Sequence, residues 1–390
     1  MSELTYLEKL LDGAEVEWFS VNDVFDIFAG GDIPKDSLSD IQTDEYNIPI
    51  YSNGIGSRAL YGWTNKAKID APSLTISARG TIGWTSYQEN PFFPVVRLLV
   101  LTPKIQLNLK YSYYFMKMIE GDYKVPKTGI PQLTKPMLKD IKLPIPCPDN
   151  PEKSLAIQSE IVRILDTFTA LTAELTAELT AELSMRKKQY NYYRDQLLSF
   201  DDREIEWKNL GAVAEINTGQ KPSEILDNPT TFDYINAGTT RSGYTTVSNC
   251  DGDTVTTPSR GQGGIGFVGY QQGPFWLGPL CYKMRAIDKR ILINKFLFYF
   301  LQSRRELLLN LKKEGGVPAV NKSDLATLAI PLPPLDEQNR IVAILDKFYI
   351  LTNSITEGLP LEIELRQKQY EYYRDMLFSF PKPEVAEAEA

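Results

Sequence analysis

The clearest pattern of apolar and polar positions lies in the middle of the chain, between residues 156 and 200. No proline or glycine interrupts this stretch. Apolar residues recur there at steps of mostly three and four, at positions 157, 161, 164, 165, 168, 171, 175, 179 and 183. This spacing predicts an amphipathic helix of about 45 residues, which is roughly 67 Å at 1.5 Å per residue. Because such a helix is longer than a small domain is wide, it must bridge two parts of the molecule.

Within this predicted helix, the sequence TAEL occurs three times without interruption from Thr172 to Leu183. The leucines of the run and the one before it are strictly four residues apart: Leu171, Leu175, Leu179 and Leu183. A step of four turns a helix by about 400°, so this stripe winds slowly around the helix instead of forming a straight seam. The glutamates of the run have the same spacing and repel one another mildly. The leucines therefore predict a partner surface, and a second long helix is the obvious candidate.

The chain contains a second copy of this pattern. At an offset of 180 residues, IVRILDTFTALT (161–172) matches IVAILDKFYILT (341–352), and RKKQYNYYRDQLLSF (186–200) matches RQKQYEYYRDMLFSF (366–380). Further upstream the offset is 187, between GIPQLTKPMLKDIKLPIP (129–146) and GVPAVNKSDLATLAIPLP (316–333). The chain is therefore two diverged copies of one unit, a globular domain followed by a helix.

The pattern predicts an α+β fold with two pseudo-symmetric globular domains, joined by two long antiparallel helices that form a coiled-coil spacer. The predicted boundaries are 1–153 for the first domain, 154–200 for its helix, 201–336 for the second domain, 337–380 for its helix and 381–390 for a disordered tail. Gly358 and Pro360 predict a kink near 358–360 in the second helix. The residues predicted to pack the spacer are Leu171, Leu175, Leu179, Leu183, Ile341, Leu345 and Phe348.

The first residues of the chain share the spacing of both helix ends. The three sets are Tyr6, Leu10 and Leu11; Tyr193, Leu197 and Leu198; and Tyr373, Leu377 and Phe378. One interpretation is a third, truncated copy of the helix end, which would make the organisation nearly circular. The alternative is coincidence, since three positions are few.

Composition matters mainly through what it excludes. The chain of 390 residues has no histidine, which excludes Ser-His-Asp and Cys-His catalytic sites and histidine-ligated metals. Its three cysteines, Cys147, Cys250 and Cys281, have neither zinc-site nor disulfide-framework spacing. No apolar run approaches the roughly 20 residues of a membrane span. We therefore expect a cytoplasmic protein with no metal site and no membrane segment.

The formal net charge of −8 hides two basic segments. Residues 104–142 hold eight lysines against three acidic residues, and residues 283–324 hold ten basic residues against four acidic ones. Arg, Asn and Gln read base edges, while Lys, Arg and backbone amides bind phosphates. The candidate DNA contacts in the first copy are Asn53, Arg58, Arg79, Thr81, Lys124, Lys127 and Gln132. Those in the second copy are Asn236, Arg241, Arg260, Gln262, Lys312, Lys313 and Asn321. For any one of these residues, the alternative to DNA contact is a solvated position on the protein surface.

Two further motifs suggest enzymes but fail on context. GQGGIG (261–266) fits the dinucleotide pattern G-x-G-x-x-G, yet no strand precedes it and no helix follows it. A glycine-rich turn that presents a DNA-facing loop is favoured. NPFF (90–93) lacks the second proline of the amino-methyltransferase motif, and its copy reads GPFW (273–276). A turn with buried aromatic residues is favoured there.

The tandem TAEL units, the paired IV-x-ILD-x-F and Q-Y-x-YYRD-x-L segments and the paired G-[IV]-P segments carry a specific resemblance. The chain resembles the DNA specificity subunits of type I restriction–modification systems, particularly the subclass with TAEL-type repeats. The likeness spans nearly the whole chain but is weak within the globular domains. It implies two target-recognition domains that each read half of a split DNA site, a helical spacer that sets the gap, and no catalytic activity in this chain.

The resemblance also implies partners and cofactors. The implied partners are double-stranded DNA, two methyltransferase (modification) subunits and restriction/translocase subunits. No cofactor is expected on this chain itself; S-adenosylmethionine, ATP and Mg would belong to the partner subunits. The alternatives are a protein-binding scaffold with coiled-coil arms, or a stand-alone nucleic-acid enzyme. Failure to bind DNA even with the methyltransferase partners present would favour the scaffold. Activity of the purified chain without partners would favour the stand-alone enzyme.

Overall fold

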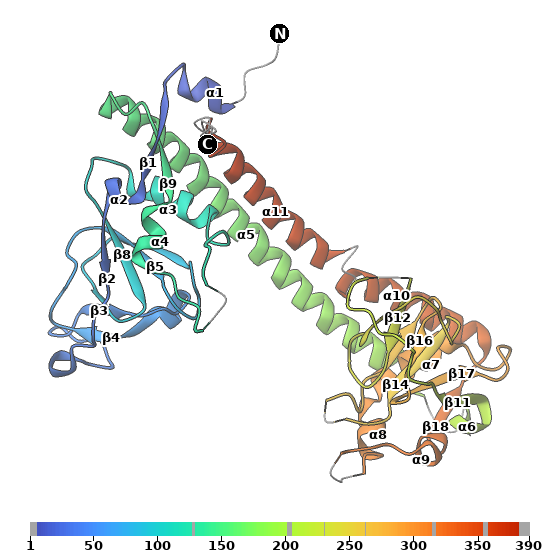
Figure 1. Cartoon of the computed structure of the whole chain (residues 1–390). Helices are drawn as coiled ribbons and strands as arrows, with labels where there is room; N and C mark the ends of the chain where they lie inside the picture. Colours follow the sequence, from blue (N-terminus) through green and yellow to red (C-terminus); the bar gives the residue numbers. More distant parts are fainter. Residues whose placement is uncertain are drawn as a thin grey trace. The chain divides into compact units, whose positions relative to one another are not determined.

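The computed structural model describes residues 6–126, 129–200, 205–229, 231–261, 263–313, 317–353 and 358–381. The chain divides into two compact units (Figure 1). Unit 1 comprises residues 1–177 and 364–390, and unit 2 comprises residues 178–363. Helix α5 (Pro151–Leu197) contributes its first part to unit 1 and its last part to unit 2. Both units combine sheets with helices, which confirms the predicted α+β class.

Unit 1 contains three sheets. One has the order β2-β8-β5-β6, a second the order β4-β3-β7, and in the third β1 pairs with β9. The strands are β1 (Val16–Ser20), β2 (Phe25–Ala29), β3 (Ile48–Tyr51), β4 (Leu60–Thr64), β5 (Ser73–Ser77), β6 (Thr85–Gln88), β7 (Phe93–Pro94), β8 (Leu98–Pro103) and β9 (Lys142–Pro146). The helices besides α5 are α1 (Tyr6–Leu11), α2 (Val21–Val24), α3 (Leu109–Met118) and α4 (Lys135–Lys139), with 3₁₀ turns η1 (Lys35–Ser37) and η2 (Gly56–Ala59).

Unit 2 repeats this topology strand for strand. Its sheets have the orders β11-β17-β14-β15, β13-β12-β16 and β10-β18. The strands are β10 (Glu206–Asn209), β11 (Ala214–Thr218), β12 (Phe232–Ile235), β13 (Gly243–Thr245), β14 (Thr254–Pro258), β15 (Gly269–Gln271), β16 (Trp276–Leu277), β17 (Cys281–Ala286) and β18 (Ala329–Leu332). The helices are α6 (Leu210–Val213), α7 (Asn294–Ser303), α8 (Arg305–Asn310), α9 (Lys322–Ala326) and α10 (Leu335–Asn353). The equal strand orders confirm that the chain is an internal duplication.

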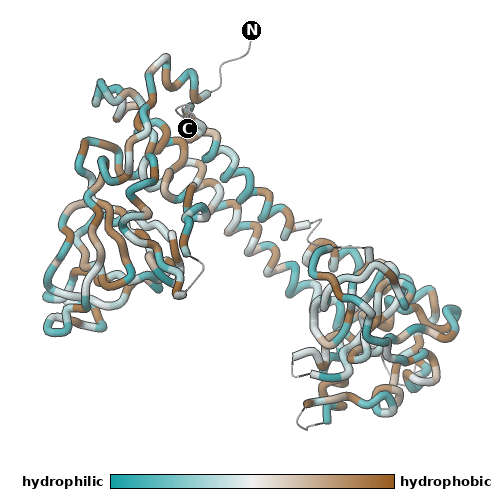
Figure 2. Tube along the Cα trace, in the orientation of Figure 1, coloured by the Kyte–Doolittle hydropathy of each residue, from teal (hydrophilic) through white to brown (hydrophobic). Residues whose placement is uncertain are grey.

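The same polar anchor ties each globular part to a long helix. Asp166 on α5 accepts hydrogen bonds from Tyr114 (2.6 Å) and Lys110 (2.9 Å) on α3. The equivalent set in unit 2 joins α10 to α7, with distances of 2.5 Å and 2.8 Å, and consists of Asp346, Tyr299 and Lys295. The apolar sides of these helices complete the hydrophobic cores of their units. In Figure 2 the long helices alternate between hydrophobic and hydrophilic residues, as amphipathic helices do.

The long helices pack on one another within each unit. In unit 1, Phe168 of α5 stacks on Tyr373 of α11 (Leu359–Leu377), with ring centroids 5.2 Å apart. One residue further along α5, the Thr169 hydroxyl donates to the Tyr370 hydroxyl at 3.2 Å, so the two helices run antiparallel. In unit 2 the repeat-equivalent rings, Tyr193 of α5 and Phe348 of α10, stack at 5.8 Å. The duplication therefore extends to the helix contacts.

The structure corrects three members of the predicted packing stripe. Leu171 is 49% exposed, because the four-residue step turns its side chain away from the side of α5 that packs. Ile341 and Leu345 are fully buried, but in the globular core of unit 2, where α10 packs on α7, and not between spacer helices. Phe348 stacks on Tyr193 as described. The remaining three, Leu175, Leu179 and Leu183, are half-buried.

The second long helix is interrupted where the sequence predicts a kink. Helix α10 ends at Asn353 and α11 begins at Leu359. Gly358 has a φ of +80°, and its carbonyl oxygen accepts the Glu362 amide at 3.2 Å, so it caps α11. A Cβ at this position would lie 2.8 Å from the carbonyl oxygen of Leu351, a contact that only glycine avoids. Pro360 falls in the first turn of α11, where a missing N–H costs nothing.

The two ends of the described chain share the core of unit 1. Leu377, Phe378 and Phe380 are each at most 4% exposed, and the Trp18 indole donates to the Pro381 carbonyl at 2.7 Å. Helix α1 buries its leucines in the same core. The end of α5 is buried equivalently in unit 2, through Leu198. The end of the C-terminal helix therefore completes the core of unit 1 in the way that the end of α5 completes the core of unit 2. This equivalence supports the circular interpretation. The predicted tail is outside the described residues from position 382 on.

Candidate nucleic-acid interface

Four of the predicted contacts in unit 1 meet in one cluster. Asn53 follows β3, Arg79 and Thr81 follow β5, and Gln132 lies just before α4. The Asn53 amide donates to the Arg79 carbonyl at 2.7 Å, and the Thr81 hydroxyl donates to the Asn53 carbonyl. The Arg79 guanidinium donates to the Gln132 side-chain oxygen from Nε at 2.9 Å and from Nη2 at 2.6 Å. Side chains chosen separately by residue type are thus brought together by the fold.

This cluster orients Arg79. Gly80, with a φ of +73°, turns the chain directly after the arginine. Two of the five guanidinium donors are held by Gln132, and the structure pairs Arg79 with no carboxylate among the described residues. The remaining donors can form the bidentate contact to guanine O6 and N7 that arginine makes in the major groove. Arg79 is therefore the best-oriented candidate for reading a base edge.

The other predicted contacts in unit 1 are less constrained. Arg58 is exposed in the turn η2, and Lys124 is exposed after α3. Lys127 lies outside the described residues. The neighbouring Ile130 is 76% exposed at the tip of the G-[IV]-P loop, and its repeat equivalent Val317 is 63% exposed.

The equivalent loop of unit 2 has the same backbone frame. In unit 1 the Leu133 amide donates to the Ala78 carbonyl at 2.9 Å, and in unit 2 the Val320 amide donates to the Ser259 carbonyl at the same distance. This bond fixes the G-[IV]-P loop beside the arginine that follows β5 or β14. In unit 2 that arginine is Arg260, which is exposed and forms a β-bridge with Ala319. Gln262 lies outside the described residues.

The remaining predicted residues of unit 2 have internal partners. The Asn236 side-chain oxygen accepts the Leu280 amide at 2.9 Å. Arg241 forms an ion pair with Asp233 at 3.2 Å and donates to the Tyr244 hydroxyl. Lys313 lies 2.8 Å from Asp324 and, with the Asn321 and Ser323 side chains, holds the pKa of that carboxyl below its ordinary value. Lys312 is half-buried. Sequence reasoning could not see these partners, which reduce the donors available to DNA.

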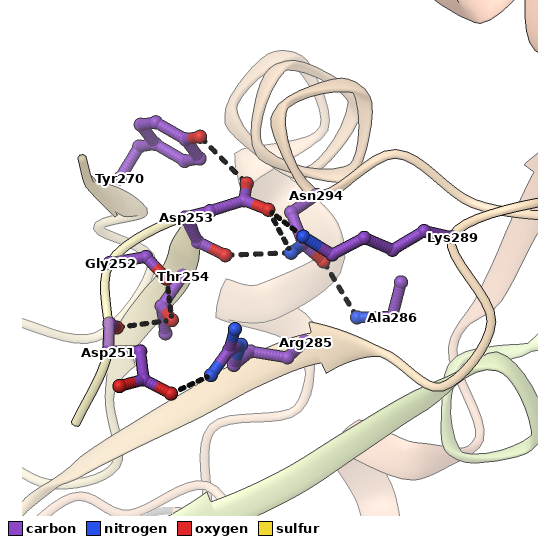
Figure 3. Close-up of polar contacts among 9 residues, drawn as sticks. All are labelled: Asp251, Gly252, Asp253, Thr254, Tyr270, Arg285, Ala286, Lys289 and Asn294. Carbon is purple, nitrogen blue, oxygen red and sulfur yellow. Dashed lines mark hydrogen bonds and ion pairs between the residues drawn. The ribbon is translucent and has the colours of Figure 1, made fainter. Parts of the chain in front are cut away.

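Part of the basic segment 283–324 is neutralised in the same way (Figure 3). Arg285 pairs with Asp251 at 3.1 Å, and Lys289 pairs with Asp253 at 2.8 Å. Burial raises the pKa of Asp253, but hydrogen bonds from Lys289, Tyr270 and Asn294 outweigh burial and hold it below its ordinary value. These cations brace the turn that enters β14. A count of lysines and arginines therefore overstates the free positive charge here.

One candidate in unit 1 was missed by sequence reasoning. Arg97 is an exposed residue with a φ of +82°, a conformation that non-glycine residues rarely adopt and that is frequent at functional sites. It lines a groove of about 980 Å³ together with Lys35 and Lys66, and two acidic residues, Asp32 and Asp36, line the same groove. Nothing in the local sequence VVRLL signals the left-handed turn, so only the structure reveals this arginine.

Acidic side chains and cysteines are the remaining candidates for metal or thiol chemistry. No group of three or more His, Cys, Asp or Glu side chains could hold a metal ion there. The cysteines are free thiols, and burial raises the pKa of Cys281 to about 12, which opposes a nucleophilic role. No described helix is long and apolar enough to cross a membrane.

The duplicated units, their polar clusters and the long helix correspond to a known family. The family of the type I restriction modification DNA specificity domain matches the chain twice, over residues 14–185 and 203–365. The chain belongs to this specificity family. It is 40% identical to the specificity subunit of the type I restriction enzyme EcoR124I/EcoR124II from Escherichia coli, over 99% of each chain. It is 36% identical to the EcoprrI specificity subunit from the same species, over 92% of this chain and 93% of that protein.

Solved structures agree on the fold of the specificity family. The S subunit of the type I restriction–modification system from M. genitalium covers 98% of this chain and 99% of its own, with a TM-score of 0.51 and 17% identity. A structure described under complex assembly and conformational transition of the type I R-M system covers 93% of this chain and 97% of its own, with a TM-score of 0.59 and 16% identity. At these identities the likeness concerns the fold alone. Family membership itself makes DNA recognition the function of this chain and disfavours the scaffold and stand-alone enzyme alternatives.

Proposed function

We propose that this chain is the non-catalytic subunit that reads a bipartite DNA site with a fixed gap, and that it directs modification and restriction subunits to that site. The observation that carries the proposal is the duplicated topology, with the same polar loop frame in both units and one continuous helix running from one into the other. Each unit reads one half-site through the loops that follow its β5 or β14 strand. The long helices set the distance between the half-sites.

We infer that the number of TAEL units in α5 sets the length of the gap between the half-sites. Each TAEL segment adds four residues to α5, or about 6 Å of helix. At about 3.4 Å per base pair, this corresponds to at most about 2 base pairs of B-DNA. The run also supports membership of the subclass that carries such repeats between its halves.

We assign catalysis and cofactors to partner subunits. Two methyltransferase subunits would bring S-adenosylmethionine, and restriction/translocase subunits would bring ATP and Mg, in the cytoplasm where the target DNA lies. The net charge of −8 fits a subunit whose partners supply many of the phosphate contacts. The chain's own part is to orient and space the base-reading side chains.

The direct test is to co-express the chain with its methyltransferase subunit and to map every methylated base in the host genome. The proposal predicts methylation at a split motif with one fixed gap. A complex that is assembled and supplied with S-adenosylmethionine but adds no methyl groups would contradict it. Methylation of a single continuous motif would also contradict the division into two half-sites.

A further inference from the structure

A pocket in unit 2 has cationic side chains that the recognition loops do not use. It has a volume of about 420 Å³ and lies between α5, α10, the start of α8 and the turn before β15. Three basic residues line it: Lys187, Arg194 and Arg305. Its other polar lining includes Tyr190, whose hydroxyl donates to the Gln302 side-chain oxygen at 3.1 Å. This bond leaves the Gln302 amide hydrogens, with the three cations, as donors toward the pocket.

Little of this positive charge is neutralised internally. Arg194 pairs with Asp195 at 2.8 Å. In the part of the chain that the structure describes, no carboxylate pairs with Lys187 or Arg305, and the pocket lining itself contains no acidic residue. The pocket therefore has the chemistry of an anion site: several donors that converge from separate elements, with net positive charge.

The internal duplication provides a control for this interpretation. Gly83 in unit 1 and Gly266 in unit 2 have φ values of +89° and +87°. A Cβ on Gly83 would contact the carbonyl oxygen of Glu120. Arg305 is the repeat equivalent of Glu120, and a Cβ on Gly266 would lie 3.2 Å from its Nε atom. The same site therefore exists in both units, with the glycine-rich turn packed on the residue that follows the end of α3 or α7 by two positions.

In unit 1 the equivalent position carries an ion pair that neutralises its charge. Glu120 replaces Arg305, and its carboxylate binds Lys117 at 2.7 Å and the Thr85 amide at 2.6 Å. Lys117, which replaces Gln302, lies 3.6 Å from the ring centroid of Trp84. Gln367 replaces Lys187. The ion pair of unit 1 is thus replaced by excess positive charge in unit 2, so Lys187 and Arg305 are not required by the fold. Arg194 has an arginine equivalent in unit 1, Arg374.

We propose that this pocket of unit 2 binds a phosphate group of the DNA backbone, and so gives unit 2 a phosphate contact that unit 1 lacks. The inference rests on the proposed DNA-reading function. The pocket adjoins the glycine-rich turn that follows Arg260, so a strand read at that arginine passes close to it. Such a contact positions the duplex and carries no sequence information.

The test installs the residues of unit 1 in unit 2. The variant K187Q/Q302K/R305E keeps the fold, because each new residue already occupies the equivalent place in unit 1. Loss of one phosphate contact should weaken DNA binding by the assembled modification complex roughly tenfold at 0.1 M salt, equally on cognate and non-cognate DNA. The slope of log affinity against log salt concentration should become shallower by about 0.9. A charge-matched control, K208Q/R290Q, removes two exposed cations that already pair with Glu206 and Asp288 and should change neither quantity by as much.

Four results would overturn the inference. Unchanged affinity and salt slope would show that DNA does not reach the pocket. A loss confined to cognate DNA would indicate base reading, and failure of the variant to assemble would indicate an acidic segment of a partner subunit as the ligand. Binding of inorganic phosphate or ATP to the wild-type complex, lost in the variant while DNA affinity stays constant, would assign the pocket to a free anion. If the wild-type complex binds DNA specifically, the proposed function survives each of these results.

Discussion

Replacing Asp346 by asparagine tests how the long helix is held against the globular part of unit 2. The Asp346 carboxylate accepts the Tyr299 hydroxyl at 2.5 Å and the Lys295 ammonium at 2.8 Å. Burial, together with the bond to Asp346, raises the pKa of Tyr299, so the phenol remains a donor at any physiological pH. Asparagine has nearly the same shape but no charge, so the substitution removes the electrostatic part of both contacts.

The size of the effect follows from the exposure of the partners. A hydrogen bond to a charged group contributes about 1.5–3 kcal/mol, and the asparagine oxygen retains part of the bond to the buried Tyr299. The side chains of Lys295 and Asp346 are 31% and 29% exposed, so their ion pair contributes only roughly 0.5–1 kcal/mol. Together the loss is about 2 kcal/mol of local stability. This corresponds to roughly 30-fold more frequent opening of the contact between α7 and α10.

Hydrogen exchange measured by mass spectrometry resolves this prediction by segment. Peptides from α7 and α10 should exchange roughly 30-fold faster in the Asp346→Asn variant, while those from α3 stay unchanged. The matched variant Asp166→Asn should produce the reverse pattern, because Asp166 makes the equivalent contacts in unit 1. Equal exchange in variant and wild type, or acceleration spread evenly over both units, would refute the idea that these aspartates are local anchors.

Three further predictions concern single residues. Arg79→Lys loses the two bonds that converge on the Gln132 side-chain oxygen and can no longer make a bidentate contact to a base. We expect discrimination to fall by about 1–3 kcal/mol at one position of one half-site, and a methylation map should show relaxed sequence there and an unchanged second half-site. Gly358→Ala forces a side chain into a φ of +80°, and we expect a loss of at least about 1–2 kcal/mol in chemical denaturation; an unchanged midpoint would argue against this cap. Burial raises the pKa of Cys281 to about 12, so iodoacetamide at pH 8 should modify the half-buried Cys147 first. The thiol of Cys281 ionises at lower pH in the unfolded chain than in the folded one. The free energy of unfolding should therefore also fall as pH rises from about 9 towards 12, by up to about 1.4 kcal/mol per pH unit. Rapid labelling of Cys281 in the native protein would contradict both the labelling order and this pH dependence.

The duplication could be predicted because a repeat in sequence forces a repeat in structure. Offsets of 180 and 187 residues mark the same helix and loop in both units, and the equal strand orders follow from them. The helix spacing was also predictable, but periodicity does not identify what covers an apolar stripe. Ile341 and Leu345 have the period of a helix pair and instead complete a globular core.

The candidate site was predictable by residue type and not by arrangement. Asn53, Arg79 and Gln132 lie on separate segments, and only the pairing of strands brings them together. Ion pairs had the opposite effect at Lys313 and Arg241: their partners, Asp324 on α9 and Asp233 on β12, lie on elements that the sequence could not place beside them. Arg97 was missed because its left-handed backbone is set by tertiary contacts and has no local signature.

The measurement that tests the central claim most directly is the gap recognised after one TAEL unit is deleted from α5. The variant, lacking four of the residues between Thr172 and Leu183, would be co-expressed with its methyltransferase subunit and its methylated sites mapped beside those of the wild type. Our account predicts both half-sites unchanged and a gap shorter by about one or two base pairs. A changed half-site with the same gap would contradict a spacer role for the long helix.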